Sequence, residues 1–189
     1  MSIISSALFV IGMLSTTLSF AADNSGKTLD TGAVFMGAGA SYYPSMHIGT
    51  GNVLSGIDFR VAGSDSWKVQ IGPQINGALW ISGGIFLNLD LSAFAKFSYS
   101  FALPKQRSID LYGKLPIGYS YILAGGGGAG GSNSGLHVGF FPGVAYFLNK
   151  RVGLFSEIGF LDRIFRLFRE GDAVHSFALS ANIGVTINF

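Results

Sequence analysis

The chain of 189 residues has no cysteine and few charged residues, and each shortage excludes certain classes of protein. Without cysteine there is no disulfide framework, thiolate nucleophile, zinc–thiolate site or lipid attachment through cysteine. Only 12% of the residues are charged, whereas soluble domains carry about 25%. The formal net charge is only +2, so we expect no nucleic-acid partner. The chain is instead 49% hydrophobic, but its 28 glycines and 5 prolines do not suit a bundle of membrane helices.

The N-terminal segment has the features of a secretory signal peptide. Residues 7–18 form an apolar run that is too short to span a bilayer as a helix. Ser19-Phe20-Ala21 then places small residues at the −3 and −1 positions of a signal-peptidase site. We therefore expect residues 1–21 to be removed and residues 22–189 to form the mature domain. No Lys or Arg precedes the apolar run, which leaves a membrane anchor or a misplaced start codon as alternatives.

Beyond residue 30 the dominant pattern has a period of two, which is typical of β-strands. In the last segment the odd positions are all apolar: Phe177, Leu179, Ala181, Ile183, Val185, Ile187 and Phe189. The even positions between them are small or polar. A helix would scatter these two sets around its circumference, so the segment is predicted to be a strand. The same alternation recurs in residues 67–79, 85–101 and 109–121.

Breakers divide the chain into eight predicted strands. These are 32–43, 53–61, 67–79, 85–101, 108–122, 136–148, 151–162 and 174–189. Their lengths match or exceed the roughly 9–11 residues of a tilted transmembrane strand. Counted back from a periplasmic C-terminus, the turns 62–66, 102–107 and 149–150 fall in the periplasm. The connections 44–52, 80–84, 123–135 and 163–173 fall outside, and short inner turns with longer outer loops are typical of outer-membrane barrels.

The position of the charges distinguishes a membrane barrel from a soluble sandwich, which alternation alone cannot do. Four cations and four anions lie on the polar face of the predicted strands: Asp58, Arg60, Lys68, Asp90, Lys96, Asp110, Lys114 and Glu157. The apolar face has no charge except Asp162 near a strand end. Because Lys or Arg at the lipid-facing midplane costs about 2–4 kcal/mol, this pattern favours a lipid-facing apolar surface. Large aromatic residues near the strand ends fit interfacial girdles. A soluble sandwich is the alternative.

The C-terminal sequence Asn182-Ile183-Gly184-Val185-Thr186-Ile187-Asn188-Phe189 resembles the terminal signal that the barrel-assembly machinery reads. In that signal a Gly, an apolar residue near the end and a terminal aromatic correspond to Gly184, Ile187 and Phe189. The hairpin-like residues 142–154 also resemble the OmpA/OmpX-like eight-stranded outer-membrane superfamily. The resemblance implies an all-β, transmembrane, eight-stranded antiparallel up-and-down β-barrel in the bacterial outer membrane. It also implies a monomer that contacts the assembly machinery, outer-membrane lipid and lipopolysaccharide.

A barrel of eight strands has an interior that side chains can fill. We therefore expect the eight charges of the polar face to form a lumen network in which cations and anions pair, since an unpaired buried charge costs several kcal/mol. This favours a non-enzymatic outer-membrane protein, with a role in envelope integrity or in surface contacts made by its loops. The alternatives are a narrow channel for small solutes and a lipid A-modifying enzyme.

Candidate catalytic groups are few. The histidines are His47, His137 and His175, and none lies in the His-x-Ser-Asn motif that a resemblance to lipid A deacylases would require. His175 and Ser176 are neighbours and point to opposite faces of a strand, which is poor geometry for a base and a nucleophile. His175 with Glu157 of the adjacent strand is the other pairing considered. We predict no catalytic residue, no metal site and no cofactor.

Two outer connections have distinctive sequences. Arg163, Arg166 and Arg169 alternate with apolar residues. If exposed, these guanidinium groups could bind the phosphates of lipopolysaccharide, and the alternative is an extended strand or a short rim helix. The glycine run at 125–131 has no Lys-Ser/Thr after it and precedes no helix, so it is not a phosphate-binding loop. It is predicted to be a surface loop.

Overall fold

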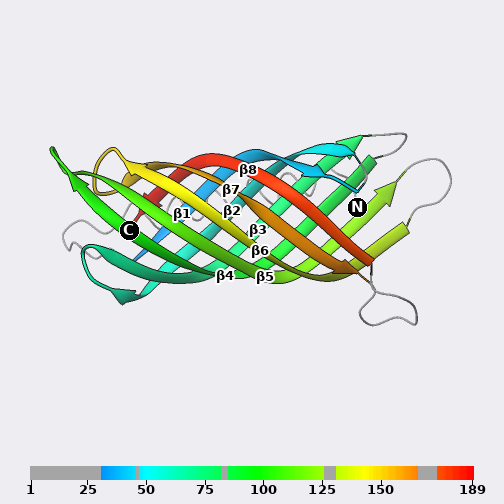
Figure 1. Ribbon diagram of the computed structural model, residues 1–189, viewed down its shortest axis with the longest axis horizontal. Helices are drawn as coiled ribbons and strands as arrows, with labels where there is room; N and C mark the ends of the chain where they lie inside the picture. The colour runs from blue at the N-terminus through cyan, green and yellow to red at the C-terminus, as the bar shows by residue number, and fades with distance from the viewer. Residues whose placement is uncertain (1–30, 46, 82–84, 126–130, 166–173) are drawn as a thin grey trace.

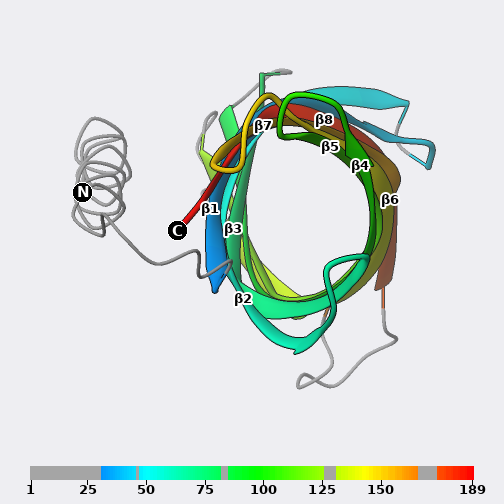
Figure 2. The same cartoon turned by 90° about the vertical axis from the view of Figure 1, so that its left-hand side faces the viewer.

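The chain folds into one closed β-barrel of eight strands (Figure 1). The computed structural model describes residues 31–45, 47–81, 85–125, 131–165 and 174–189, so the expected signal peptide at 1–21 lies outside the described residues. The strands are β1 Gly32–Tyr43, β2 Ile48–Gly63, β3 Trp67–Ile81, β4 Ile85–Leu103, β5 Arg107–Gly125, β6 Gly131–Phe147, β7 Val152–Phe165 and β8 Val174–Asn188. Figure 2 shows the closed ring of strands along the barrel axis. Among the described residues, no helix is long and apolar enough to cross a membrane.

Every strand pairs antiparallel with its neighbours in sequence, which confirms the predicted up-and-down topology. The seam joins β1 to β8 from Ala33 opposite Asn188 to Tyr42 opposite Leu179. At its end the amide of Phe189 donates to the carbonyl of Gly32 at 3.0 Å. Closure therefore leaves no unpaired strand edge, as a β-structure in a lipid bilayer requires.

Several strands are longer than the sequence predicted. Residues 48–52 belong to β2, and most of the predicted loop at 123–135 belongs to β5 and β6. The register there continues from Leu123 opposite Ser132 to Ala124 opposite Gly131. Gly and Ser lack the side-chain alternation that indicates a strand, yet their backbone groups complete the ladder as well as those of other residues. The predicted boundaries at these two places were therefore wrong.

The two faces of the strands are inverted relative to a soluble protein. Large apolar side chains are among the most exposed residues, with exposed fractions of 67% for Ile183, 66% for Ile158 and 63% for Ile117. Charged side chains such as Asp58 and Glu157 are instead buried inside the barrel. Such a continuous apolar exterior is stable only against lipid, so the soluble sandwich is excluded and the protein is an outer-membrane barrel.

The end of the barrel at which β1 begins and β8 ends is assigned to the periplasm. Three or four residues connect the strands at this end, at 64–66, 104–106 and 148–151. The opposite end carries connections of up to eight residues, at 166–173. Short periplasmic turns and longer outer loops are typical of outer-membrane barrels.

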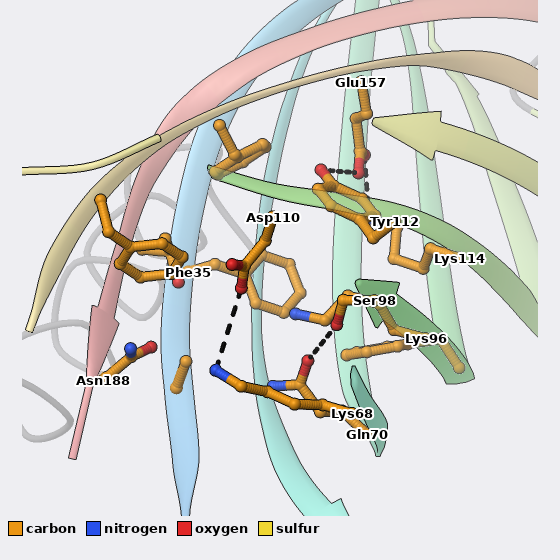
Figure 3. Close-up of a pocket in the computed structure, with 15 residues that line it drawn as sticks. Phe35, Lys68, Gln70, Lys96, Ser98, Asp110, Tyr112, Lys114, Glu157 and Asn188 are labelled. Carbon is orange, nitrogen blue, oxygen red and sulfur yellow. Dashed lines mark hydrogen bonds and ion pairs between the residues drawn. The ribbon is translucent and has the colours of Figure 1, made fainter. Parts of the chain in front are cut away.

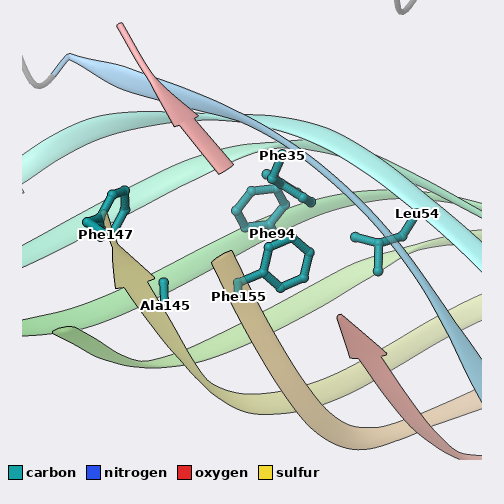
Figure 4. Packing of buried hydrophobic residues seen from close by; sticks show 6 residues of the cluster. All are labelled: Phe35, Leu54, Phe94, Ala145, Phe147 and Phe155. Carbon is teal, nitrogen blue, oxygen red and sulfur yellow. The ribbon is translucent and has the colours of Figure 1, made fainter. Parts of the chain in front are cut away.

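Part of the hydrophobic core lies within the barrel, in the half nearer the periplasm. The inward-facing cluster consists of Phe35, Leu54, Phe94, Ala145, Phe147 and Phe155 (Figure 4). The ring of Phe35 makes edge-on contacts with Phe94 and Phe155, at centroid distances of 5.6 and 6.2 Å. The lumen is thus packed by apolar rings as well as by the charged groups that the sequence indicated.

Candidate functional site in the barrel lumen

Four ion pairs are distributed along the lumen, each joining different strands. From the periplasmic end outward they are Lys68–Asp110 at 3.9 Å, Lys96–Asp58, Lys114–Glu157 at 2.8 Å and Arg163–Asp90 at 2.7 Å. Each pair balances one positive and one negative charge. The four pairs therefore leave no net charge among the eight charged side chains that line the lumen of the described chain.

The composition of this network differs from the prediction at one position. Seven of the eight expected residues take part in the four pairs, but Arg60 lies at the periplasmic rim and donates to the carbonyl of Ser64 at 3.0 Å. Its place is taken by Arg163, which is only 2% exposed. The expected lipopolysaccharide contact through Arg163 is therefore wrong, because β7 extends to Phe165 and turns this side chain inward. Arg166 and Arg169 lie outside the described residues.

The Lys114–Glu157 pair is the centre of a plug across the lumen. The ammonium group of Lys114 lies 5.2, 5.8 and 5.6 Å from the ring centroids of Phe35, Phe94 and Phe141. Cation–π attraction strengthens in such a desolvated position. The carboxylate of Glu157 accepts from Lys114 at 2.8 Å and from the hydroxyl of Tyr112 at 3.1 Å (Figure 3). Ionic and aromatic groups thus hold one another in place.

A small cavity lies on each side of this plug. The inner one has a volume of about 40 Å³ and is lined by Lys68, Lys96, Asp110, Phe35, Phe94 and Tyr112, among others (Figure 3). The outer one measures about 20 Å³ and is lined by Asp90, Ser92 and neighbouring residues. Lys114 and Glu157 line both. A water molecule needs about 10–15 Å³, so each cavity can hold only a few waters.

Asp90 organises the outer half of the lumen. Its carboxylate accepts from both Nε and Nη2 of Arg163, at 3.1 and 2.7 Å. It also accepts from the hydroxyl of Ser120 at 2.6 Å and from the amides of Asn76 and Asn88, both at 3.1 Å. A bidentate guanidinium and several neutral donors are the arrangement that best stabilises a buried carboxylate.

His137 connects to this group through a chain of hydrogen bonds that the sequence did not reveal. Its Nε2 lies 2.7 Å from Ser92 Oγ and its Nδ1 lies 2.9 Å from Ser120 Oγ. Because Ser120 donates its proton to Asp90, its oxygen accepts from Nδ1–H, and Nε2 then accepts from Ser92. Gly118 lies between Ser92 and His137 in the strand register, and its missing side chain leaves room for the contact.

These groups include the serine, histidine and aspartate of a nucleophilic relay, but they are enclosed. His137 is 2% and Ser92 is 8% exposed, and the adjacent cavity of about 20 Å³ is too small for a lipid or sugar. The arrangement therefore fixes the positions of β4, β5 and β6 relative to one another. Among the described residues, no cluster of three or more potential ligands is placed to hold a metal ion.

The other histidines lie away from the lumen. The Nδ1 of His175 is 3.1 Å from Asp162 Oδ2 on the outer surface of the barrel. Glu157 points into the lumen and is 4% exposed, so the pairing of His175 with Glu157 is wrong. His47 lies in the β1–β2 connection with a φ of 54°.

The three residues of the expected assembly signal lie along β8 and its end. A Cβ on Gly184 would lie 2.1 Å from the carbonyl oxygen of Met36, so this position needs the small residue. Ile187 is half-buried. Phe189 is 37% exposed and contacts Phe59 with a centroid distance of 6.4 Å.

Comparison with known proteins identifies the fold but no family. No family model and no curated protein sequence matches the chain. Neisserial surface protein A matches with a TM-score of 0.61 and 13% identity, over 85% of this chain and 97% of that one. The attachment invasion locus protein of Yersinia pestis matches with a TM-score of 0.53 and 11% identity, over 84% and 97%. The N-terminal barrel domain of Pseudomonas aeruginosa OprF gives 0.50 and 12%, over 84% and 98%. The chain thus shares the eight-stranded fold of outer-membrane proteins.

Proposed function

We propose that the protein is a non-enzymatic, non-conducting outer-membrane barrel that supports envelope integrity and presents its outer connections for surface contacts. The observation that carries this proposal is the plug formed by Lys114 and Glu157 among aromatic rings. A permeant solute would have to separate this pair in a nearly dry environment. Leaving one member of a buried pair uncompensated costs about 3–5 kcal/mol, so a pathway through the plug is rarely open.

The outer connections are where we place the surface contacts. They consist of residues 44–47, 82–84, 126–130 and 166–173 between the strands. Arg166 and Arg169 are proposed to bind anionic groups of lipopolysaccharide there. The attachment invasion locus protein, which has a similar fold, has been crystallised with the heparin analogue sucrose octasulfate. That complex supports a surface role for such a barrel but assigns no ligand to this chain.

An experiment that shortens two outer connections tests the surface role separately from folding of the barrel. Residues 126–130 and 166–173 are each replaced by Asn-Gly, which closes a two-residue hairpin. Cells that produce the wild type are expected to resist detergent with EDTA better than cells lacking the protein. The variant with both connections shortened is expected to lose most of this protection while it keeps its heat-modifiable mobility on gels. Full protection by this variant would contradict the proposal.

The two alternative functions make opposite predictions. A lipid A-modifying enzyme would change the mass of lipid A in cells that produce the protein, whereas we expect identical mass spectra with and without it. A narrow channel would release small solutes from liposomes. We expect liposomes that carry the wild type to retain a small trapped solute as well as protein-free liposomes do.

A further inference from the structure

The periplasmic rim of the barrel is strongly basic. We define this rim as residues 60–66, 104–107 and 148–151, which form or flank the three turns around the mouth in Figure 2. Its charged side chains are Arg60, Lys105, Arg107, Lys150, Arg151 and Asp65. Five cations and one anion give a side-chain charge of +4. All but Arg60, which is half-buried, are exposed.

This charge is not a general property of the protein. The other cations of the described chain are Lys68, Lys96, Lys114 and Arg163, and each forms an ion pair with a carboxylate in the lumen. The formal net charge of the full chain is only +2. The excess of positive charge among the described residues is thus concentrated on one ring at one end of the barrel.

Lipid-facing aromatic residues place this ring relative to the membrane. Trp67, Tyr99 and Phe101 are 39%, 46% and 47% exposed on the barrel exterior at the same end. Trp67 stacks on Phe97 at a centroid distance of 6.4 Å, and Tyr99 contacts Phe101 at 5.0 Å. Such residues lie at the boundary between hydrocarbon and headgroups. The boundary is therefore close to the first turn residues.

In the sequence, the rim cations come only a few residues after the aromatic residues that mark this boundary. Lys105 comes four residues after Phe101, which is at most about 13 Å along a strand that rises about 3.3 Å per residue. The headgroup layer of one leaflet is about 5–7 Å thick. Tilt of the strands and the reach of long cationic side chains bring the charged groups back toward this layer. The rim cations are thus within reach of the lipid phosphates.

We propose that the periplasmic rim is a binding site for the headgroups of anionic phospholipids. The guanidinium group of Arg107 can hold a phosphate with two parallel hydrogen bonds, and the lysines add charge attraction. A zwitterionic headgroup offers the same phosphate but brings its own cation, which the charge of +4 repels. The rim therefore selects lipids with net negative charge, and clustered Lys and Arg near a bilayer have this preference in general.

Trp67 gives this proposal a local reporter. The sequence contains two tryptophans, Trp67 and Trp80, so Trp80→Phe leaves a single indole at the periplasmic girdle. The protein is reconstituted in phosphatidylcholine vesicles that contain either brominated phosphatidylglycerol or brominated phosphatidylcholine, and quenching of Trp67 fluorescence is measured. We expect phosphatidylglycerol to occupy the sites beside Trp67 about tenfold more strongly than phosphatidylcholine. In 0.5 M salt this preference should largely disappear.

Variants with neutral rim residues, made in the Trp80→Phe background, show whether the lipid preference depends on the charge of the rim. The combined variant K105Q/R107Q/K150Q/R151Q is expected to quench equally with both lipids. The matched control Asp65→Asn removes the one rim anion and should keep or increase the preference. Heat-modifiable mobility shows that each variant is folded. An unchanged preference in the combined variant, or equal quenching in the wild-type rim, would overturn the proposal. So would binding of purified peptidoglycan by the rim without any lipid preference.

Discussion

At the scale of single residues, the lumen depends on charges that are tolerated only because they are paired. Lys114 shows this most clearly, because its side chain is 4% exposed and has one carboxylate partner, Glu157, together with three aromatic rings. The pair is expected to add little net stability, since the cost of removing both ions from water offsets much of their attraction. Removing one ion or both should therefore have very different effects.

A double-mutant cycle at Lys114 and Glu157 tests this. Lys114→Met keeps the volume but leaves Glu157 uncompensated, so the free energy of unfolding should fall by about 3–5 kcal/mol. Lys114→Met combined with Glu157→Gln removes both charges and should recover at least half of that loss. Urea unfolding in detergent micelles, followed by gel mobility, measures both. Equal destabilisation by the single and the double variant would show that the two charges are not coupled.

Gly118 is the second residue on which the lumen depends. A Cβ at this position would lie 2.0 Å from the carbonyl oxygen of Leu91 and 2.6 Å from Ser92 Cα, both backbone atoms. Gly118→Ala should therefore force β4 and β5 apart and destabilise the barrel by about 1–3 kcal/mol. The control is Gly77→Ala, where the nearest atom is 3.8 Å away, and a change within about 0.5 kcal/mol is expected. Equal effects in urea unfolding would contradict this explanation.

At the scale of the strands, the alternation of side chains predicted the number, order and facing of all eight. It worked because one face must be apolar against lipid, so each strand carries the pattern over its whole membrane depth. It failed where the apolar alternation is missing: residues 48–52 and the glycine-rich end of β6 carry mostly small or polar side chains, yet they continue the backbone ladders. Arg163 was misplaced for the same reason, because the predicted end of the strand at 162 left it in a loop.

The extended strand ends can be tested by hydrogen exchange. Amide protons of Asn52 and of residues 132–135 should exchange slowly, because they lie in the β2–β3 and β5–β6 ladders. Exchange as fast as that of an unstructured peptide, measured by mass spectrometry of the folded protein, would show that these segments are loops, as the sequence predicted. The amides of the central β4 strand provide the protected reference.

The lumen network shows what the sequence could not establish. Alternation indicated that Lys114 and Glu157 face the same interior, but it could not say which cation meets which anion across strands far apart in the chain. The chain of hydrogen bonds from Ser92 through His137 to Asp90 was missed because it depends on the register around Gly118. A small residue between two polar ones in adjacent strands was the one available signal.

At the scale of the whole molecule, the barrel has apolar side chains outside and ion pairs inside, which is the reverse of a soluble protein. Because all strand edges are paired, unfolding is expected to be cooperative, and the folded form should resist detergent at room temperature. Unheated samples in dodecyl sulfate should therefore migrate faster than boiled ones. A single mobility that does not depend on heating would contradict a closed barrel.

The central claim of this account is that the plug closes the lumen, and ion conductance across a planar bilayer tests it most directly. The wild type is expected to give no stepwise currents in 1 M KCl. Phe94→Ala combined with Glu157→Ala removes one ring and the carboxylate from the plug and joins the two cavities, so small steps should appear. Regular conductance steps in the wild type, at the frequency seen for the opened variant, would show that the lumen is a channel and would contradict the account.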